Sequence, residues 1–223
     1  MSTSNIEKVL AQADSVDINE GKVAYQNYHL LMKRIAIYYG AGFAQTVAAF
    51  VSLSPNNDYT GNLRSLVTVL SCIKEGKDIH KVTTSAYGHC KLRAYSFLIG
   101  EKDFLLETQG LKITNFYCNI LRPDDPRFVT IDGHMSNVWA GKVRNMKLAL
   151  IGKPSKYQQI ADGFKKVARH HKLLPNQIQG ICWFTWKRIN NLRYDNQLNL
   201  FGSEDDYWGL KLKPENIQPY KEK

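Results

Sequence analysis

A lysine and an aspartate twenty residues apart are the side chains of this chain best suited to covalent chemistry. Lys112 follows Gly110 in the stretch Leu106-Glu107-Thr108-Gln109-Gly110-Leu111-Lys112, and Asp132 lies in Val129-Thr130-Ile131-Asp132-Gly133-His134. A deprotonated amine can attack a sugar carbon and form a Schiff base, while a carboxylate stabilises the cationic sugar. For that attack the lysine pKa must fall, through burial or neighbouring cations. The pair therefore indicates nucleophilic chemistry on a sugar.

The elements that must position this pair are a hairpin before Lys112 and an extended segment before Asp132, residues 127–131, which we call the pass. We predict a short helix over residues 102–107, a tight turn at Gly110 in a left-handed or otherwise strained conformation, and a helix over 112–121. The exposed amides at the start of the second helix form a seat for a phosphate. Residues 127–131 are expected to be extended, and Asp132 to begin a helix that reaches about residue 140.

Helical periodicity dominates the rest of the chain. The other predicted helices cover residues 4–13, 23–39, 41–53, 60–73, 87–99, 157–170 and 176–189, with Gly or Pro at most of their ends. No stretch shows the repeated alternation of a sheet. The sequence therefore predicts an all-α protein.

Composition points to a polyanionic partner. Thirty Lys and Arg face 20 Asp and Glu, for a formal net charge of +10. Such an excess favours nucleic acid first and an anionic membrane surface second. The four cysteines, at positions 72, 90, 118 and 182, form no C-x-x-C pair, so we expect no iron–sulfur cluster and no metal site. No leader pattern or membrane-length apolar run is present, and we expect a cytoplasmic, DNA-associated monomer that does not enter membranes.

The motif and its spacing resemble the helix-hairpin-helix DNA glycosylase superfamily, the group of endonuclease III and 8-oxoguanine glycosylase. That superfamily has Leu-Pro-Gly-Val-Gly-x-Lys in its hairpin and Val-Asp-x-His about twenty residues after the lysine. Glu107 and Thr108 depart from it, since they replace the hairpin proline and the first glycine. The runs Ser-Pro-Asn-Asn and Val-Thr-Ile-Asp-Gly-His are also similar to a little-characterised set of phage-type relatives, which implies a phage-encoded protein in a bacterial host.

The resemblance implies a two-lobed helical bundle with a helix-hairpin-helix motif. The implied catalytic region spans residues 21–190, with a cleft between its lobes. A polar arm over residues 1–20 precedes it, and a tail over 191–223 that packs on or near the body follows it. No cofactor is implied, although a monovalent cation at the hairpin is compatible with the motif.

The implied function is a DNA glycosylase with AP-lyase activity that flips a damaged or modified base out of double-stranded DNA. Asp132 and Lys112 would be catalytic, and His134 would be a structural neighbour of the site. The residues expected to contact DNA are Gly110, Asn115, the wedge residues Asn56 and Asn57, and the basic residues Lys165, Lys166 and Arg169.

Each of these residues also has a structural interpretation. Lys112 is compatible with a solvated lysine, Asp132 with a plain N-cap, and the two asparagines with turn residues. Trp183 and Trp186, three apart, are expected to form a core stripe. Two other functions remain open: a DNA pyrimidine-modifying enzyme on the same fold, and a non-catalytic DNA-binding module.

Overall fold

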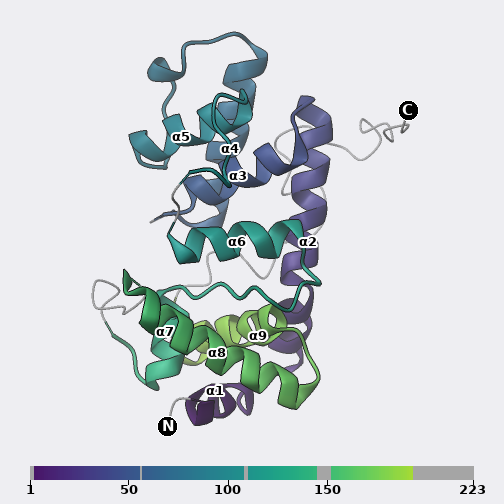
Figure 1. The fold of residues 1–223 in the computed structure, drawn as a ribbon, viewed down its shortest axis with the longest axis vertical. Helices are drawn as coiled ribbons and strands as arrows, with labels where there is room; N and C mark the ends of the chain where they lie inside the picture. The colour runs from purple at the N-terminus through teal and green to yellow at the C-terminus, as the bar shows by residue number, and fades with distance from the viewer. Residues whose placement is uncertain (1–2, 56, 108–109, 145–151, 193–223) are drawn as a thin grey trace. The chain divides into compact units, whose positions relative to one another are not determined.

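Helices account for the regular structure throughout the described part of the chain (Figure 1). The computed structural model describes residues 3–55, 57–107, 110–144 and 152–192. Within these ranges there are nine α-helices and one short 3-10 helix, and no strand. The prediction of an all-α protein is thereby confirmed.

The chain divides into two compact units. Among the described residues, unit 1 comprises 3–29, 110–144 and 152–192, and unit 2 comprises 30–55 and 57–107. Helix α2 (Ser15–Tyr39) contributes to both, because the boundary falls between His29 and Leu30. The predicted tail over residues 191–223 lies almost entirely outside the described residues.

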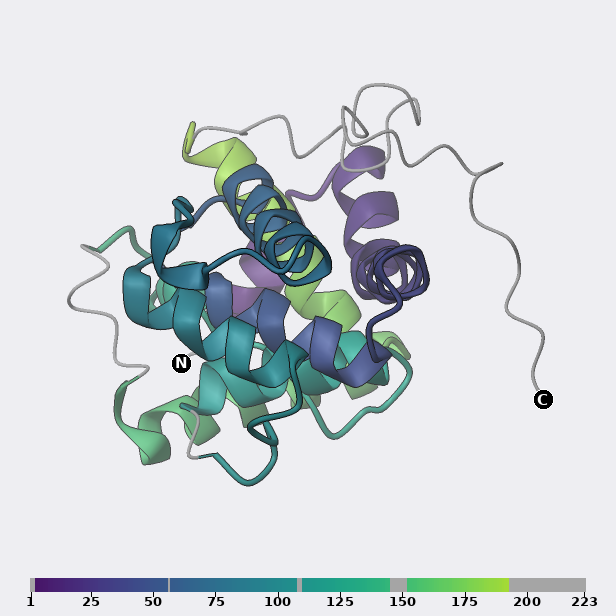
Figure 2. The same ribbon diagram turned by 90° about the horizontal axis from the view of Figure 1, so that it is seen from above.

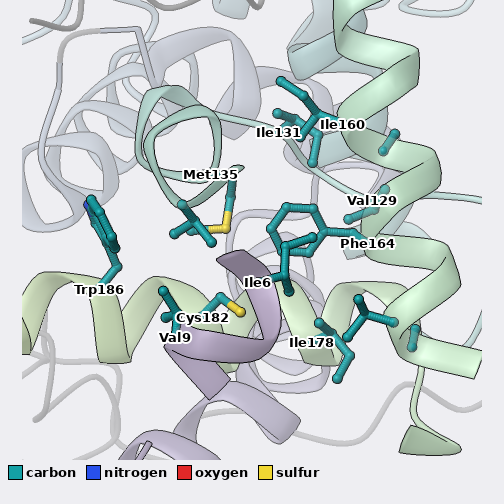
Figure 3. Close-up of a cluster of buried hydrophobic side chains, with 14 of the residues drawn as sticks. Ile6, Val9, Val129, Ile131, Met135, Ile160, Phe164, Ile178, Cys182 and Trp186 are labelled. Atoms are coloured by element: carbon teal, nitrogen blue, oxygen red, sulfur yellow. The ribbon is translucent and has the colours of Figure 1, made fainter. Parts of the chain in front are cut away.

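Unit 1 holds the elements that carry the predicted catalytic pair. Besides the first part of α2, it contains α1 (Thr3–Leu10), α6 (Leu111–Leu121), α7 (Gly133–Ala140), α8 (Pro154–His171) and α9 (Pro175–Ile189). Its core joins apolar residues of α1, α7, α8 and α9 with Val129 and Ile131 of the pass between α6 and α7 (Figure 3). Phe164, on α8, is fully buried at the centre of this cluster. The pass before Asp132 is therefore anchored in the core.

The N-terminal residues belong to this core rather than to the expected polar arm. Ile6 is fully buried and Val9 is 4% exposed, both within the unit 1 cluster. Asn5 donates from Nδ2 to the carbonyl of Trp139 at 3.0 Å. Arg188 on α9 bridges to Asp17 at 2.6 Å, and Asp17 is itself almost fully buried. Residues 3–10 are mostly polar, but Ile6, Val9 and Leu10 form a narrow apolar stripe on this helix.

A glycine pair allows α2 and α9 to cross at close range within unit 1. A Cβ built on Gly180 would overlap the backbone carbonyl of Gly21, and one built on Gly21 would overlap the backbone of Ile181. Neither glycine has an unusual backbone angle, since the described glycines with a left-handed conformation are Gly40, Gly76, Gly100 and Gly141. Here the absence of a side chain, rather than backbone freedom, is what the structure requires.

Unit 2 packs three helices together after the second part of α2. They are α3 (Phe43–Leu53), α4 (Tyr59–Lys74) and α5 (Gly88–Leu98), with the 3-10 helix η1 (Ile79–Lys81) between the last two (Figures 1 and 2). The small residues of α3 allow close packing, and every residue from Thr46 to Leu53 is buried. Helix α4 begins one residue before the predicted start at Thr60, because Asp58 caps it by accepting a hydrogen bond from the Gly61 N–H at 2.6 Å.

No single described helix is long and apolar enough to cross a membrane. Helices α2 and α3 meet that criterion only as a pair bent by 114°.

Candidate functional site

The carboxylate of Asp132 is held by two N–H donors at the start of α7. Oδ1 accepts a hydrogen bond from the backbone N–H of Met135 at 2.8 Å, as an N-cap does. Oδ2 accepts from the indole Nε1–H of Trp183, on α9, at 3.2 Å. The side chain remains partly exposed. The predicted helix start at Asp132 is confirmed, and the second donor shows that the residue is more than a local cap.

The extended pass before Asp132 is fixed from two helices. Tyr157 of α8 accepts the Ile131 N–H at 3.1 Å and donates to the Val129 carbonyl at 3.0 Å. From α6, Asn119 hydrogen-bonds the Thr130 hydroxyl at 2.9 Å, and Asn115 accepts the Val129 N–H at 3.2 Å. These contacts pin the three residues before Asp132, so the position of the carboxylate is set by α6 and α8 together.

Two buried tyrosines lie close enough to Asp132 to be affected by its charge. Tyr25 donates to Gln179 Oε1 at 2.7 Å, and it is only 6% exposed. Burial raises the pKa of Tyr25 well above its ordinary value, and the negative charge of Asp132 acts in the same direction. Burial likewise raises the pKa of Tyr157, with Asp132 again adding to the effect. Both tyrosines are therefore neutral hydrogen-bonding groups and not bases at physiological pH.

Trp183 joins Asp132 to a buried lysine that lies outside the predicted motif. The Nζ of Lys187 lies 4.2 Å from the centroid of the Trp183 ring, and Lys187 is only 7% exposed. A cation over an indole face is favourable, the more so when it is shielded from water. The spacing of four residues on α9 could have predicted this pair. Which face of α9 meets Asp132 could not be read from the sequence.

His134 borders the same tryptophan. Its ring meets Trp183 edge-on, with 6.3 Å between the ring centroids. Its Nδ1 is buried and has no hydrogen-bond partner among the described residues. Trp186 is part of the unit 1 core, and Trp183 packs against the same cluster. The expected tryptophan stripe is thus confirmed, and the indole N–H of Trp183 also reaches Asp132.

Lys112 lies in the first turn of α6 and is partly exposed. Within the described part of the chain its side chain makes no hydrogen bond or ion pair, with Asp132 or any other residue. The asparagines that tie α6 to the pass connect the two predicted catalytic residues indirectly. Both polar atoms of the Asn115 side chain are hydrogen-bonded, since Oδ1 accepts the Val129 N–H and Nδ2 donates to the Leu111 carbonyl at 2.8 Å. Its observed role is to anchor the pass.

The hairpin differs from the predicted one. Residues 104–106 form a turn in place of the expected short helix, with the Leu105 N–H donating to Asp103 Oδ1 at 2.8 Å. Gly110 has φ −66° and ψ 148°, which any residue can adopt, so the predicted left-handed or strained glycine is wrong. Gly110 still caps α6 without a side-chain hydrogen bond. Thr108 and Gln109 lie outside the described residues.

The other expected DNA contacts belong to different units. Asn56 lies outside the described residues, while Asn57 donates to the Leu53 carbonyl at 3.3 Å as a turn residue does. On α8, Lys166 and Arg169 are exposed and Lys165 is partly exposed. None of these three makes an ion pair with another described residue. By their spacing of three and four residues they share one basic face of α8.

Comparison with known proteins places the chain in a family. The sequence model of a family of unknown function, DUF7178, matches residues 1–190. The chain belongs to this family. No curated protein and no solved structure matches it. The match to DUF7178 includes every residue of the site around Asp132, and it ends close to the last described helix, α9.

One group of potential metal ligands lies among the described residues, and it does not include Asp132. Among the described residues of this DUF7178 member, the one group of His and acidic side chains close enough to share an ion is Glu7 with His170 and His171. The four cysteines are free, and burial raises the pKa of each, which disfavours the thiolate that a metal or nucleophilic role needs.

Substituting Gly110 tests what this glycine does in the DUF7178 chain. A Cβ at Gly110 would meet no atom within 4 Å, and its φ is ordinary. We therefore expect Gly110→Ala to change the free energy of unfolding by no more than about 1 kcal/mol, in the stabilising direction if at all. Urea denaturation would measure it. A loss of several kcal/mol would show that the hairpin needs glycine after all.

Proposed function

We propose that this protein is a DNA glycosylase that cleaves the bond between a base and its sugar in double-stranded DNA, with Asp132 at the reaction centre. The observation that supports the proposal is the fixed carboxylate. Each oxygen of Asp132 accepts one N–H, yet the side chain is still partly exposed. A carboxylate held in one orientation and reachable from outside can stabilise positive charge as it develops on a sugar.

The surroundings of Asp132 suit an extruded base. Trp183 is a partly exposed aromatic ring with the Lys187 ammonium over it, and the buried Nδ1 of His134 is a polar atom that no described residue satisfies. Flipped bases are held by stacking on aromatic groups and by hydrogen bonds to their edges. Tyr25 and Tyr157 are neutral, so they leave Asp132 as the charged group for the cationic sugar.

The helix that carries Lys112 is also suited to DNA. Helix α6 starts at Gly110 without a side-chain cap, so its first amides can bind a phosphate. Lys112 lies in that first turn, and Asn115 and Asn119 tie the helix to the pass that ends at Asp132. The net charge of +10 and the basic face of α8 would hold the rest of the backbone.

A lyase step needs an amine, and two lysines are available. In that step Nζ bonds to C1′, the C1′–N bond breaks, and the base leaves with the electron pair and takes up a proton. Loss of the remaining Nζ proton with ring opening then gives the Schiff base, from which β-elimination cuts the strand. Lys112 is the candidate by position in the motif. Lys187 is the better buried, but its ammonium lies against Trp183, so we assign it to positioning that ring.

A nucleobase-release assay tests this function. The protein would be incubated with duplexes containing normal, damaged and hypermodified bases, and free bases would be identified by mass spectrometry. Borohydride reduction would trap any Schiff base. We expect base release, with Lys112→Gln abolishing the trapped adduct and Lys187→Met retaining it.

Three results would redirect the assignment. Trapping lost only in Lys187→Met would move the amine to α9. Intact DNA carrying an altered base would favour a pyrimidine-modifying enzyme on the same fold. Salt-sensitive binding with neither outcome would indicate a DNA-binding module.

A further inference from the structure

A group of three potential metal ligands lies in unit 1, outside the site around Asp132. It consists of Glu7 on α1 and the neighbouring residues His170 and His171 at the end of α8. One ligand atom from each lies within 4.8 Å of the other two. His171 Nε2 and Glu7 Oε2 are already 2.7 Å apart, and the two imidazole rings meet at 87° with their centroids 5.2 Å apart.

The fold fixes the two backbones that carry these ligands. Helix α1 packs against α8, with Ile6 and Val9 of α1 in the same core cluster as Phe164 and Val167 of α8. Glu7 lies between those two buried residues of α1 in sequence, so its backbone cannot move freely. At the other side, α8 ends after His171, where Lys172 adopts a left-handed conformation with φ 55°. The ligand set is therefore supported by packed elements although its side chains reach the surface.

The chemistry of the three donors selects the ion. We propose that Glu7, His170 and His171 form a Zn²⁺ site with water as the fourth ligand. Two imidazole nitrogens and one carboxylate are a donor set that zinc uses, with ligands about 2.0–2.2 Å from the metal. Around such a tetrahedron the ligand atoms are about 3.3 Å apart. Small rotations of exposed side chains bring atoms now within 4.8 Å to that separation.

The neighbourhood leaves room for the water ligand. Glu7 and His171 help to line a pocket of about 310 Å³ whose other walls are largely apolar, including Leu10 and Ile178. Lys22 also lines it, and Arg169 precedes the histidines. The positive charges of Lys22 and Arg169 repel a divalent cation, so tight binding requires all three ligands to coordinate it. The bound ion would link α1 to the end of α8, and we expect it to stabilise unit 1.

Zinc binding by the full-length protein without a histidine tag tests the proposal. Isothermal titration with ZnCl₂ is expected to give one site per chain, and the thermal midpoint is expected to rise with zinc and fall back with EDTA. His170→Asn is the decisive variant, because His170 is not part of the Glu7–His171 hydrogen bond. We expect it to weaken zinc binding at least tenfold and to abolish the zinc-dependent rise.

Matched variants distinguish this site from zinc binding elsewhere on the protein. Glu7→Gln should weaken binding similarly. His80→Asn removes an exposed histidine from unit 2 and should leave the affinity unchanged. If the wild-type protein fails to bind zinc, or if His170→Asn binds as the wild type does, Glu7 and His171 form only a hydrogen-bonded pair and the proposal is wrong. An equal loss in His80→Asn would also overturn it.

Discussion

Asp132→Asn is expected to lower the rate of base release at least 100-fold while leaving the protein folded. The asparagine loses the negative charge that would stabilise the cationic sugar, and removing a single electrostatic stabiliser commonly costs about 10²–10³ in rate. Its amide nitrogen would also meet the Trp183 N–H, donor against donor, if the oxygen kept the Met135 N–H. Single-turnover measurement of base release from the best substrate would give the ratio.

The stability of the same variant separates catalysis from folding. Asparagine is as good an N-cap as aspartate, so the free energy of unfolding should fall only by the loss of the Trp183 hydrogen bond, about 1–2 kcal/mol. Asp162→Asn provides the matched control, because Asp162 is an exposed acid of unit 1 whose carboxylate accepts, within the described residues, from Gln158 alone. It should keep full activity. Retained activity in Asp132→Asn would remove the carboxylate from the mechanism and with it the proposed site.

Trp183→Phe is expected to cause a smaller loss of activity at the same site. The phenyl ring keeps most of the contact with Lys187 and His134 but cannot donate to Asp132. If this hydrogen bond orients the carboxylate, activity should fall less than in Asp132→Asn and should fall in the chemical step rather than in DNA binding. A variant with wild-type turnover would show that the indole N–H is dispensable.

Gly180→Ala is expected to cause the largest loss of stability, about 3 kcal/mol. The new methyl group would overlap the backbone carbonyl of Gly21 where α2 crosses α9. Backbone cannot rotate away as a side chain can, so the helices must separate. Because α9 also carries Trp183 and Lys187, a shift of α9 away from α2 should lower activity as well. Denaturant unfolding followed by circular dichroism measures the first effect.

The matched control is Gly88→Ala at the start of α5. A Cβ there meets no atom within 4 Å, so this variant should be as stable as the wild type or slightly more stable. Wild-type stability in Gly180→Ala would mean that α2 and α9 are not in close contact.

The helices could be predicted because their signals are local. The glycines at positions 40 and 100 end α2 and α5 in the left-handed conformation that ordinary side chains avoid, and Asp132 caps α7 with its own carboxylate. The hairpin could not be predicted in this way. Residues 102–107 have helical composition, but Asp103 bonds the Leu105 N–H and Phe104 packs edge-on against Phe97, which together favour a turn.

By itself the sequence determined the helical class, the basic charge and the position of Asp132 at a helix start, because each depends on residues close together in the chain. Only the tertiary structure decided what surrounds that aspartate. Tyr25, Tyr157 and Trp183 reach Asp132 or the pass before it from three separate helices. It also brought Glu7 beside two histidines more than 160 residues away. Such contacts depend on how helix faces pack, and periodicity shows which residues share a face but not which face meets which partner.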